Sequence, residues 1–347
     1  MKKTLRSTVI CAVVVLLSFV LSAGSSFAQQ PSTLHENIQQ TADYLYGLID
    51  GDVSEYDGAV IINLVRAGKD CSGLAEQLQR TDWSALTFAQ KTINAVAVQL
   101  AGGEADLPEF TEETDLTLEN PYNLCTLLLL TWEENTELQN AAVAALKAYY
   151  NKDSGNGFDY YGFSADTNGL FYGALAPYAA EDADLNEMLS DALRYLEKVK
   201  SDAGYGFSEE YPDANASSTA GALTAFAAAG DKDAAADAYG KLLTYASDTD
   251  RGAFEYGGFV SSYATTDALR AMLDYSELAK EEPVVTPTQT PVTPASAEPT
   301  PEATLVPNPE TGMYFRTNGT AVYVAAILAA AVTVFMVRGR NKNSCSK

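Results

Sequence analysis

The second half of this chain repeats itself, and the repeat limits the folds that are open to it. Three segments rich in glycine and aromatic residues each precede an apolar stretch with helical spacing. Their phenylalanines recur 49 and 47 residues apart, at Phe158, Phe207 and Phe254. A threonine recurs in the stretches that follow, at Thr167, Thr219 and Thr266. A period near 50 residues, made of an outer helix, an aromatic loop and an inner helix, is typical of helical repeat proteins.

The rest of residues 29–280 also has helical periodicity. Thr33 and Glu36 have the spacing of a capping box, and Asn120-Pro121 combines an N-cap with proline at the first helical position. Sustained β-branched alternation is missing from the sequence, so we expect an all-α fold without a substantial sheet. The expected helices cover 34–49, 55–67, 71–80, 86–101, 121–132, 135–150, 165–179, 183–200, 217–229, 231–246 and 263–279, with a further short one over 109–117.

The starts of the expected inner helices carry a resemblance. Ala165-Asp166-Thr167 is followed by Ala174–Tyr178, and Ser218-Thr219 is followed by Ala225-Phe226-Ala227. These phrases resemble the prenyltransferase and squalene-cyclase repeat superfamily, most clearly over residues 140–275. The resemblance implies an α/α toroid of about six helical hairpins over residues 29–280.

The two ends of the chain have patterns that are typical of targeting and anchoring segments. Basic residues before an apolar run predict a secretory signal peptide over residues 1–28, ending at Ala28. Eight of the 13 prolines fall within residues 283–309, so residues 281–307 are expected to form a disordered, extended Pro/Thr-rich stalk. Residues 321–337 are apolar and long enough for a transmembrane helix, and residues 338–347 form a basic tail expected in the cytoplasm.

A short motif lies between the stalk and the apolar segment. Asn308, Pro309, Glu310, Thr311 and Gly312, followed by an apolar span and a basic tail, resemble the LPXTG-like sorting signal of Gram-positive surface proteins, with Asn in place of Leu. The resemblance implies that a sortase cleaves after Thr311 and attaches the protein to peptidoglycan. The alternative is a plain single-pass membrane anchor. Either anchor places the folded part outside the cell.

Charge excludes one class of partner. Residues 29–311 carry all 46 acidic side chains and 14 of the 22 basic ones, a net charge of −32. A nucleic-acid-binding protein needs a basic face, so we expect no nucleic-acid partner. His35 is the only histidine, and no paired-cysteine motif is present, so no metal or cofactor is expected. Cys71 and Cys125 could form a disulfide outside the cell or remain two buried thiols.

Aromatic side chains in the repeat loops are the candidate ligand contacts. Toroid loops gather at one end of the central cavity, and tyrosine suits sugars, ring systems and peptide side chains. Phe158, Phe207 and Phe254 are expected to wedge neighbouring repeats together. The expected ligand-binding residues are Tyr160, Tyr161, Phe163, Tyr205, Tyr211, Tyr256 and Tyr263. The partner would be a small molecule, a glycan or a surface protein.

Acidic residues in the same loops allow an alternative. Two facing carboxylates could serve as general acid and base on a polysaccharide, and Asp159, Asp166 and Asp267 are the candidates. Asp166 and Asp267 also fit as caps or first-turn acids. No motif pairs a nucleophile with a base, so we favour a non-catalytic surface binding module over a glycosidase or lyase.

Overall fold

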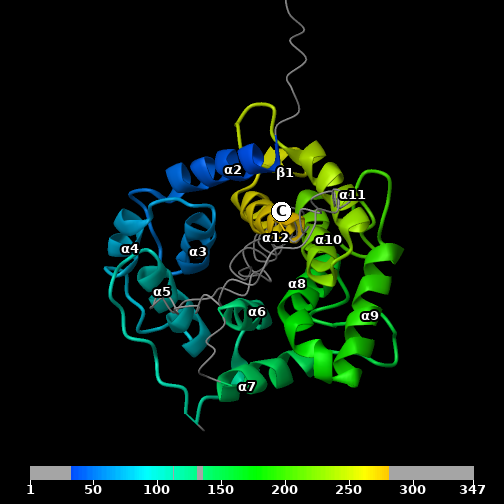
Figure 1. Ribbon diagram of the computed structural model, residues 1–347, viewed down its shortest axis with the longest axis horizontal. Helices are drawn as coiled ribbons and strands as arrows, with labels where there is room; N and C mark the ends of the chain where they lie inside the picture. Colours follow the sequence, from blue (N-terminus) through cyan, green and yellow to red (C-terminus); the bar gives the residue numbers. More distant parts are fainter. Residues whose placement is uncertain (1–32, 112, 131–135, 281–347) are drawn as a thin grey trace, which may run out of the picture. The chain divides into compact units, whose positions relative to one another are not determined.

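The computed structural model describes residues 33–111, 113–130 and 136–280. These residues are mainly α-helical, as expected, and Figure 1 labels their helices α2 to α12. The predicted signal peptide, stalk, sorting motif, transmembrane segment and basic tail lie outside them. Within the described ranges, no helix is both long and apolar enough to cross a bilayer.

The chain divides into two units, Met1–Asn37 and Ile38–Lys347. Of the first unit, the structure describes only the start of α2 (Leu34–Ile49), where the predicted capping box is present. Glu36 N donates to Thr33 Oγ1 at 3.2 Å, and Thr33 N donates to Glu36 Oε2 at 2.7 Å. The paragraphs below describe the second unit.

Six helices of this unit form an inner set. They are α3 (Gly58–Arg66), α5 (Phe88–Leu100), α6 (Pro121–Leu129), α8 (Ala165–Leu175), α10 (Ala216–Ala229) and α12 (Ser262–Lys280). Each packs against the next in this order, and α12 packs against α3, so the succession of contacts returns to its start. The Arg66–Asp274 ion pair, at 2.8 Å, joins the last helix to the first.

The inner helices α6, α8 and α10 consist mainly of apolar or small residues and are buried on almost every face, which is expected of helices that are covered all round. In α10, 11 of 14 residues are buried. Small residues let α8 and α10 approach closely: a Cβ added at Gly169 would lie 2.3 Å from the carbonyl oxygen of Gly221. Close backbone approach therefore fixes the spacing of these two inner helices.

Five outer helices cover the inner set. Besides α2 they are α4 (Ser72–Leu78), α7 (Thr136–Lys147), α9 (Ala183–Lys198) and α11 (Lys232–Leu242). Helices α4, α7, α9 and α11 pack on α5, α6, α8 and α10 respectively. Helix α9 is amphipathic: it buries Leu185, Leu189 and Leu196 and exposes charged residues on the opposite face.

The structure corrects the expectation of a helix over 109–117. In the described residues of this range and just after it, the structure has only a 3-10 turn, Leu116–Leu118. Pro108 precedes the segment, and like charges such as Glu109 and Glu113, four residues apart, oppose an α-helix. Two further expected helices also end early and continue as 3-10 turns, Ala176–Glu181 and Leu243–Tyr245.

Strand structure is minimal, as expected. Among the described residues, the regular strands are β1 (Glu255–Tyr256) and β2 (Phe259–Val260), which pair antiparallel. Gly257 and Gly258 join them with φ of +61° and +83°, a left-handed conformation that glycine adopts without strain.

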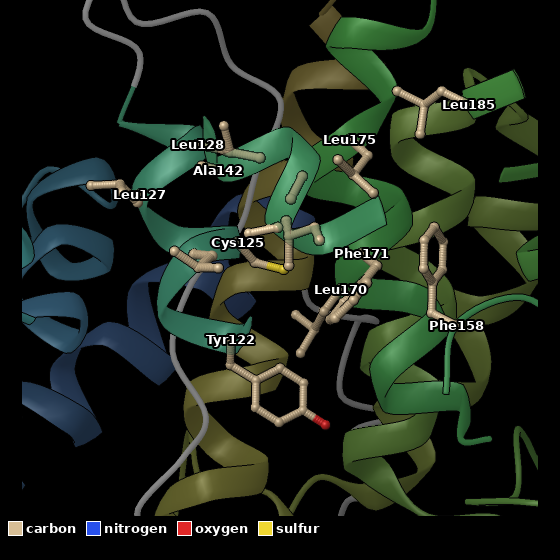
Figure 2. Packing of buried hydrophobic residues seen from close by; sticks show 14 of the residues in the cluster. Tyr122, Cys125, Leu127, Leu128, Ala142, Phe158, Leu170, Phe171, Leu175 and Leu185 are labelled. Carbon is tan, nitrogen blue, oxygen red and sulfur yellow. The ribbon is translucent and has the colours of Figure 1, made fainter. Parts of the chain in front are cut away.

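The core contains both thiols. Figure 2 shows part of the buried cluster to which Cys125, Leu170 and Phe171 contribute from α6 and α8. Cys71 is buried as well, and both cysteines are free. Of the two alternatives for this pair, the structure therefore has the two buried thiols. Burial is the main cause that raises the pKa of Cys71 to about 11.

The structure corrects the register of the aromatic repeat. In each of the three loops, the backbone N–H of one buried aromatic residue donates to a side-chain oxygen of the following inner helix. The bonds run from Phe158 to Asn168 Oδ1 at 3.0 Å, from Tyr205 to Thr219 Oγ1 at 3.1 Å and from Phe254 to Thr265 Oγ1 at 2.9 Å. Tyr205, not Phe207, is thus the equivalent of Phe158 and Phe254.

The threonine register shifts for the same reason. The acceptors equivalent to Thr219 are Asn168 and Thr265, one residue away from the predicted Thr167 and Thr266. The donor and acceptor are 10, 14 and 11 residues apart in the three loops. Because the middle loop is longer, a fixed sequence period aligns the wrong residues.

Candidate functional site

The inner helices begin at a common end of the second unit, which we name the mouth. Tyr122 and Thr167, near the starts of α6 and α8, share a hydrogen bond of 3.0 Å between their hydroxyls. Ser218 Oγ, near the start of α10, donates to Asp166 Oδ1 at 2.7 Å. The starts of α6, α8 and α10 therefore contact one another, and the loops that precede the inner helices meet at this end.

A cavity of about 290 Å³ opens at the mouth, and we name it the mouth pocket. Its wall comes from the end of α2, the loop before α3, and the starts of α3, α5, α6 and α12. Its lining residues are Leu45, Leu48, Ile49, Ser54, Glu55, Tyr56, Asp57, Ala59, Val60, Gln90, Ile93, Asn94, Asn123, Ser262, Tyr263 and Thr266. The pocket therefore combines an aliphatic wall, two tyrosine rings, amides and two carboxylates.

Hydrogen bonds hold the loop that carries the carboxylates. Asp57 Oδ2 accepts from Ser54 N at 2.7 Å and from Ser54 Oγ at 2.9 Å, closing a turn just before α3. The carbonyl oxygen of Glu55 accepts from Asn94 Nδ2 at 2.8 Å, which ties this loop to α5. The backbone of Glu55 is thus fixed to a neighbouring helix, and the side chain of Asp57 is held within the loop.

One polar group of the pocket has no hydrogen-bond partner among the described residues. Asn123 is 5% exposed, lies in the first turn of α6 and lines the cavity. Its Nδ2 is buried and makes no hydrogen bond to any described residue. Buried side-chain amides are normally bonded, so this donor is open to an acceptor atom of a bound molecule.

Four of the expected ligand-binding aromatics are exposed at the mouth. Tyr263 lines the pocket, and Tyr161, Tyr211 and Tyr256 project from loops that precede α8, α10 and α12. Tyr161 is 93% exposed and has a φ of +55°. A left-handed conformation is costly for a bulky residue, so the fold holds an exposed ring there at the expense of local stability.

The other three aromatics are partly or fully buried. Tyr160 is partly buried, and its ring packs at a tilt against Tyr161 with centroids 4.6 Å apart. Its hydroxyl accepts from Asn120 Nδ2 at 3.3 Å. Phe163 is partly buried beside Tyr195, at 6.1 Å. Tyr205 is fully buried at the repeat position described above, so its place in the structure is that of a packing residue.

The three candidate catalytic carboxylates also have structural partners. Asp159 Oδ1 accepts from Gly162 N at 3.0 Å and holds the turn beneath Tyr161. Asp166 accepts from Ser218, as described, and Asp267 lies 3.3 Å from Arg270 Nη2. None of the three lines the mouth pocket.

Asp166 and Asp267 belong to a group that we name the axial cluster: Arg66, Asp166, Asp267, Arg270 and Asp274, of which the last three are buried. Asp274 Oδ1 accepts from Arg66 Nη2 at 2.8 Å, and Arg270 is completely buried. Burial raises the pKa of Asp166, against the lowering effects of the Ser218 hydrogen bond and the Arg270 charge. Burial likewise raises the pKa of Asp274, against the neighbouring charges of Arg66 and Arg270.

The sequence reasoning missed Arg66, Arg270 and Asp274. A signal was present: Asp267, Arg270 and Asp274 are spaced three and four residues apart within one predicted helix, which places them on one face. Asp267 and Asp274 are buried together with Arg270 and oppose its charge, so the arrangement stabilises an ion network and leaves no free acid–base pair within it.

Metal binding finds no support in the described ranges, where no group of three or more His, Cys, Asp or Glu side chains is arranged to hold an ion. No known family model matches the chain. No curated protein matches it either. The geometry of the mouth is therefore the basis on which a function can be assigned.

Proposed function

We propose that this protein is a non-catalytic binding module, anchored on the outside of a Gram-positive cell, that holds a ligand at the mouth of an α/α toroid. The observation that carries the proposal is the mouth pocket, which joins an aliphatic wall, two tyrosines and an unpartnered buried amide. Ligand sites are typically concave and apolar with a few convergent polar groups, and this cavity has that composition.

The packing of the inner helices supports the toroid. Their contacts run in chain order from α3 to α12 and return to α3, and an outer helix covers each of α5, α6, α8 and α10. This is the arrangement that the resemblance to the prenyltransferase and squalene-cyclase repeats implies.

The state of the acidic residues favours binding over catalysis. A glycosidase needs two carboxyl groups that face a substrate across a cavity. Asp166 and Asp267 are instead engaged with Ser218 and Arg270. The two carboxylates of the mouth pocket, Glu55 and Asp57, lie two residues apart in one loop, where Asp57 accepts from Ser54. We therefore favour a binding module over a polysaccharide hydrolase or lyase.

The surface location rests on the predicted signal peptide, stalk and sorting motif. It is tested by digesting the wall with a muramidase. A sortase substrate is released while still attached to peptidoglycan fragments, as a ladder of masses above that of the free chain. Release of a single unmodified species by detergent alone contradicts wall attachment and indicates a membrane anchor.

Binding is tested with arrays of glycans, peptides and small molecules, using the full chain in a neutral detergent. Ligands of the mouth pocket should lose most of their binding when Tyr263 is replaced by alanine. Tyr211→Ala serves as the matched control because Tyr211 is exposed but does not line the pocket. If no array member binds, or if both variants bind as the wild type does, the proposed site is wrong.

A further inference from the structure

We propose that the mouth pocket receives the ammonium group of a lysine residue in a peptide. The inference rests on the proposed binding function and names the ligand class of the same site. Three features of the pocket point to this ligand: its charge, its aliphatic wall with two tyrosines, and the free donor of Asn123.

The charge of the pocket is negative and is not balanced within it. Glu55 and Asp57 line it, and the lining includes no Lys, Arg or His among the described residues. The axial cluster differs, because Arg66 and Arg270 offset its carboxylates. The net charge of −32 on residues 29–311 adds a field that draws cations toward the surface and repels anionic ligands.

The wall of the pocket suits the stem of a lysine side chain. Leu45, Ile49 and Ile93 form part of an aliphatic surface on which methylene groups can be buried. Tyr56 and Tyr263 supply aromatic faces, which attract an ammonium group by cation–π interaction. Lysine combines these two requirements, a hydrocarbon stem and a compact terminal charge.

The size of the pocket limits the ligand. Sites for drug-sized molecules occupy roughly 300–1,000 Å³, and this cavity of about 290 Å³ lies at the lower end. Such a volume fits one side chain better than several linked sugar rings.

Asn123 adds a requirement that a simple amine does not meet. Its buried Nδ2 needs an acceptor oxygen, and a peptide supplies carbonyl oxygens near the lysine stem. A lysine residue flanked by peptide bonds therefore satisfies the carboxylates and the amide together, whereas a free diamine satisfies only the carboxylates.

The experiment measures binding to the full chain in neutral detergent by isothermal titration calorimetry. The probes are Nα-acetyl-lysine N-methylamide, its Nε-acetyl derivative, which lacks the charge, and cadaverine. The lysine probe should bind about tenfold or more tightly than the neutral derivative, because hydrogen bonds to charged groups are the stronger ones. It should also bind more tightly than cadaverine.

Two variants locate the binding. Glu55→Gln should weaken the lysine probe about tenfold, since it removes one of the two carboxylates. Glu104→Gln, at an exposed position outside the pocket, changes the charge equally and should leave the affinity unchanged. Asn123→Leu should weaken binding of the lysine probe but not of cadaverine. If this variant misfolds, Glu55→Gln still tests the inference, because Glu55 lies on a surface loop.

The outcomes separate this inference from the proposed function. Equal affinity for the charged and Nε-acetylated probes overturns it, as does equal weakening by Glu55→Gln and Glu104→Gln. A sugar of the glycan array that binds more tightly than the lysine probe also overturns it, although Tyr263-dependent binding of such a sugar would still support a binding module. The proposed function fails together with this inference only if no array member binds in a Tyr263-dependent way.

Discussion

Replacing Arg270 with methionine probes the axial cluster. Arg270 is completely buried, and its Nη2 lies 3.3 Å from Asp267. Methionine fills much of the same space but removes the positive charge, so Asp267, Asp274 and Asp166 lose their shared cation. Removing one partner of a buried ion pair costs about 3–5 kcal/mol, because an uncompensated charge is left behind.

This cost converts to a measurable change in melting temperature. For domains of roughly 150–250 residues, 1 kcal/mol corresponds to about 2–4 °C, so Arg270→Met should lower Tm by about 6–20 °C. Urea unfolding at pH 7, followed by far-UV circular dichroism, measures the free energy directly. Arg80→Met is the matched control, because Arg80 and Glu76 are both exposed and such a pair contributes only about 0–1 kcal/mol.

The pH dependence adds a second readout. In the variant, protonating the stranded carboxylates removes the buried negative charge, so the deficit relative to wild type should narrow between pH 7 and pH 5. A deficit at pH 7 no larger than that of Arg80→Met, or one that does not change with pH, would refute the account of the cluster.

Three further predictions concern single positions. Gly169→Ala should destabilise the protein by about 1–3 kcal/mol, because the added methyl group meets the backbone of α10. Gly240→Ala, on the exposed face of α11, is the control and should stabilise the protein by about 0.5–1 kcal/mol. Urea unfolding measures both changes, and equal effects would contradict the close contact between α8 and α10. Tyr161→Gly should be more stable than Tyr161→Ala by about 1–2 kcal/mol, since both remove the ring and only glycine tolerates the left-handed backbone freely; equal melting temperatures would argue against strain there. Burial raises the pKa of Asp166, so the stability that this group contributes is present at acidic pH and is lost as the pH rises through its folded-state pKa. Asp166→Asn should therefore gain stability relative to wild type from pH 4 to pH 7. A relative loss of stability over this range in urea titrations would contradict the raised pKa.

Local signals in the sequence were sufficient to predict most helices. Asn120 caps α6, with its side chain accepting from Tyr122 N and Pro121 at the first position, as expected. The capping box of Thr33 and Glu36 is likewise present. Caps and apolar spacing involve residues within one or two turns, so one sequence contains the information that they need.

The repeat register and the pocket needed information that one sequence does not hold. A fixed period paired Phe207 with Phe158 because nothing local reveals that the loop after Tyr205 is longer. The pocket was missed because its wall is assembled from α2, the loop before α3 and the starts of four inner helices, which span Leu45 to Thr266. Only the folded arrangement brings Glu55, Asn123 and Tyr263 to one cavity.

The most direct test of the binding site follows the side-chain amide of Asn123 by NMR. The full chain, labelled with ¹⁵N-asparagine, is titrated with Nα-acetyl-lysine N-methylamide, and Asn123→Leu identifies the signal. We predict that the Nδ2 proton resonances shift downfield in a saturable way as the donor gains its acceptor, while the signal of Asn186, on the outer helix α9, stays in place. An unchanged Asn123 signal at ligand concentrations that saturate binding would contradict the account.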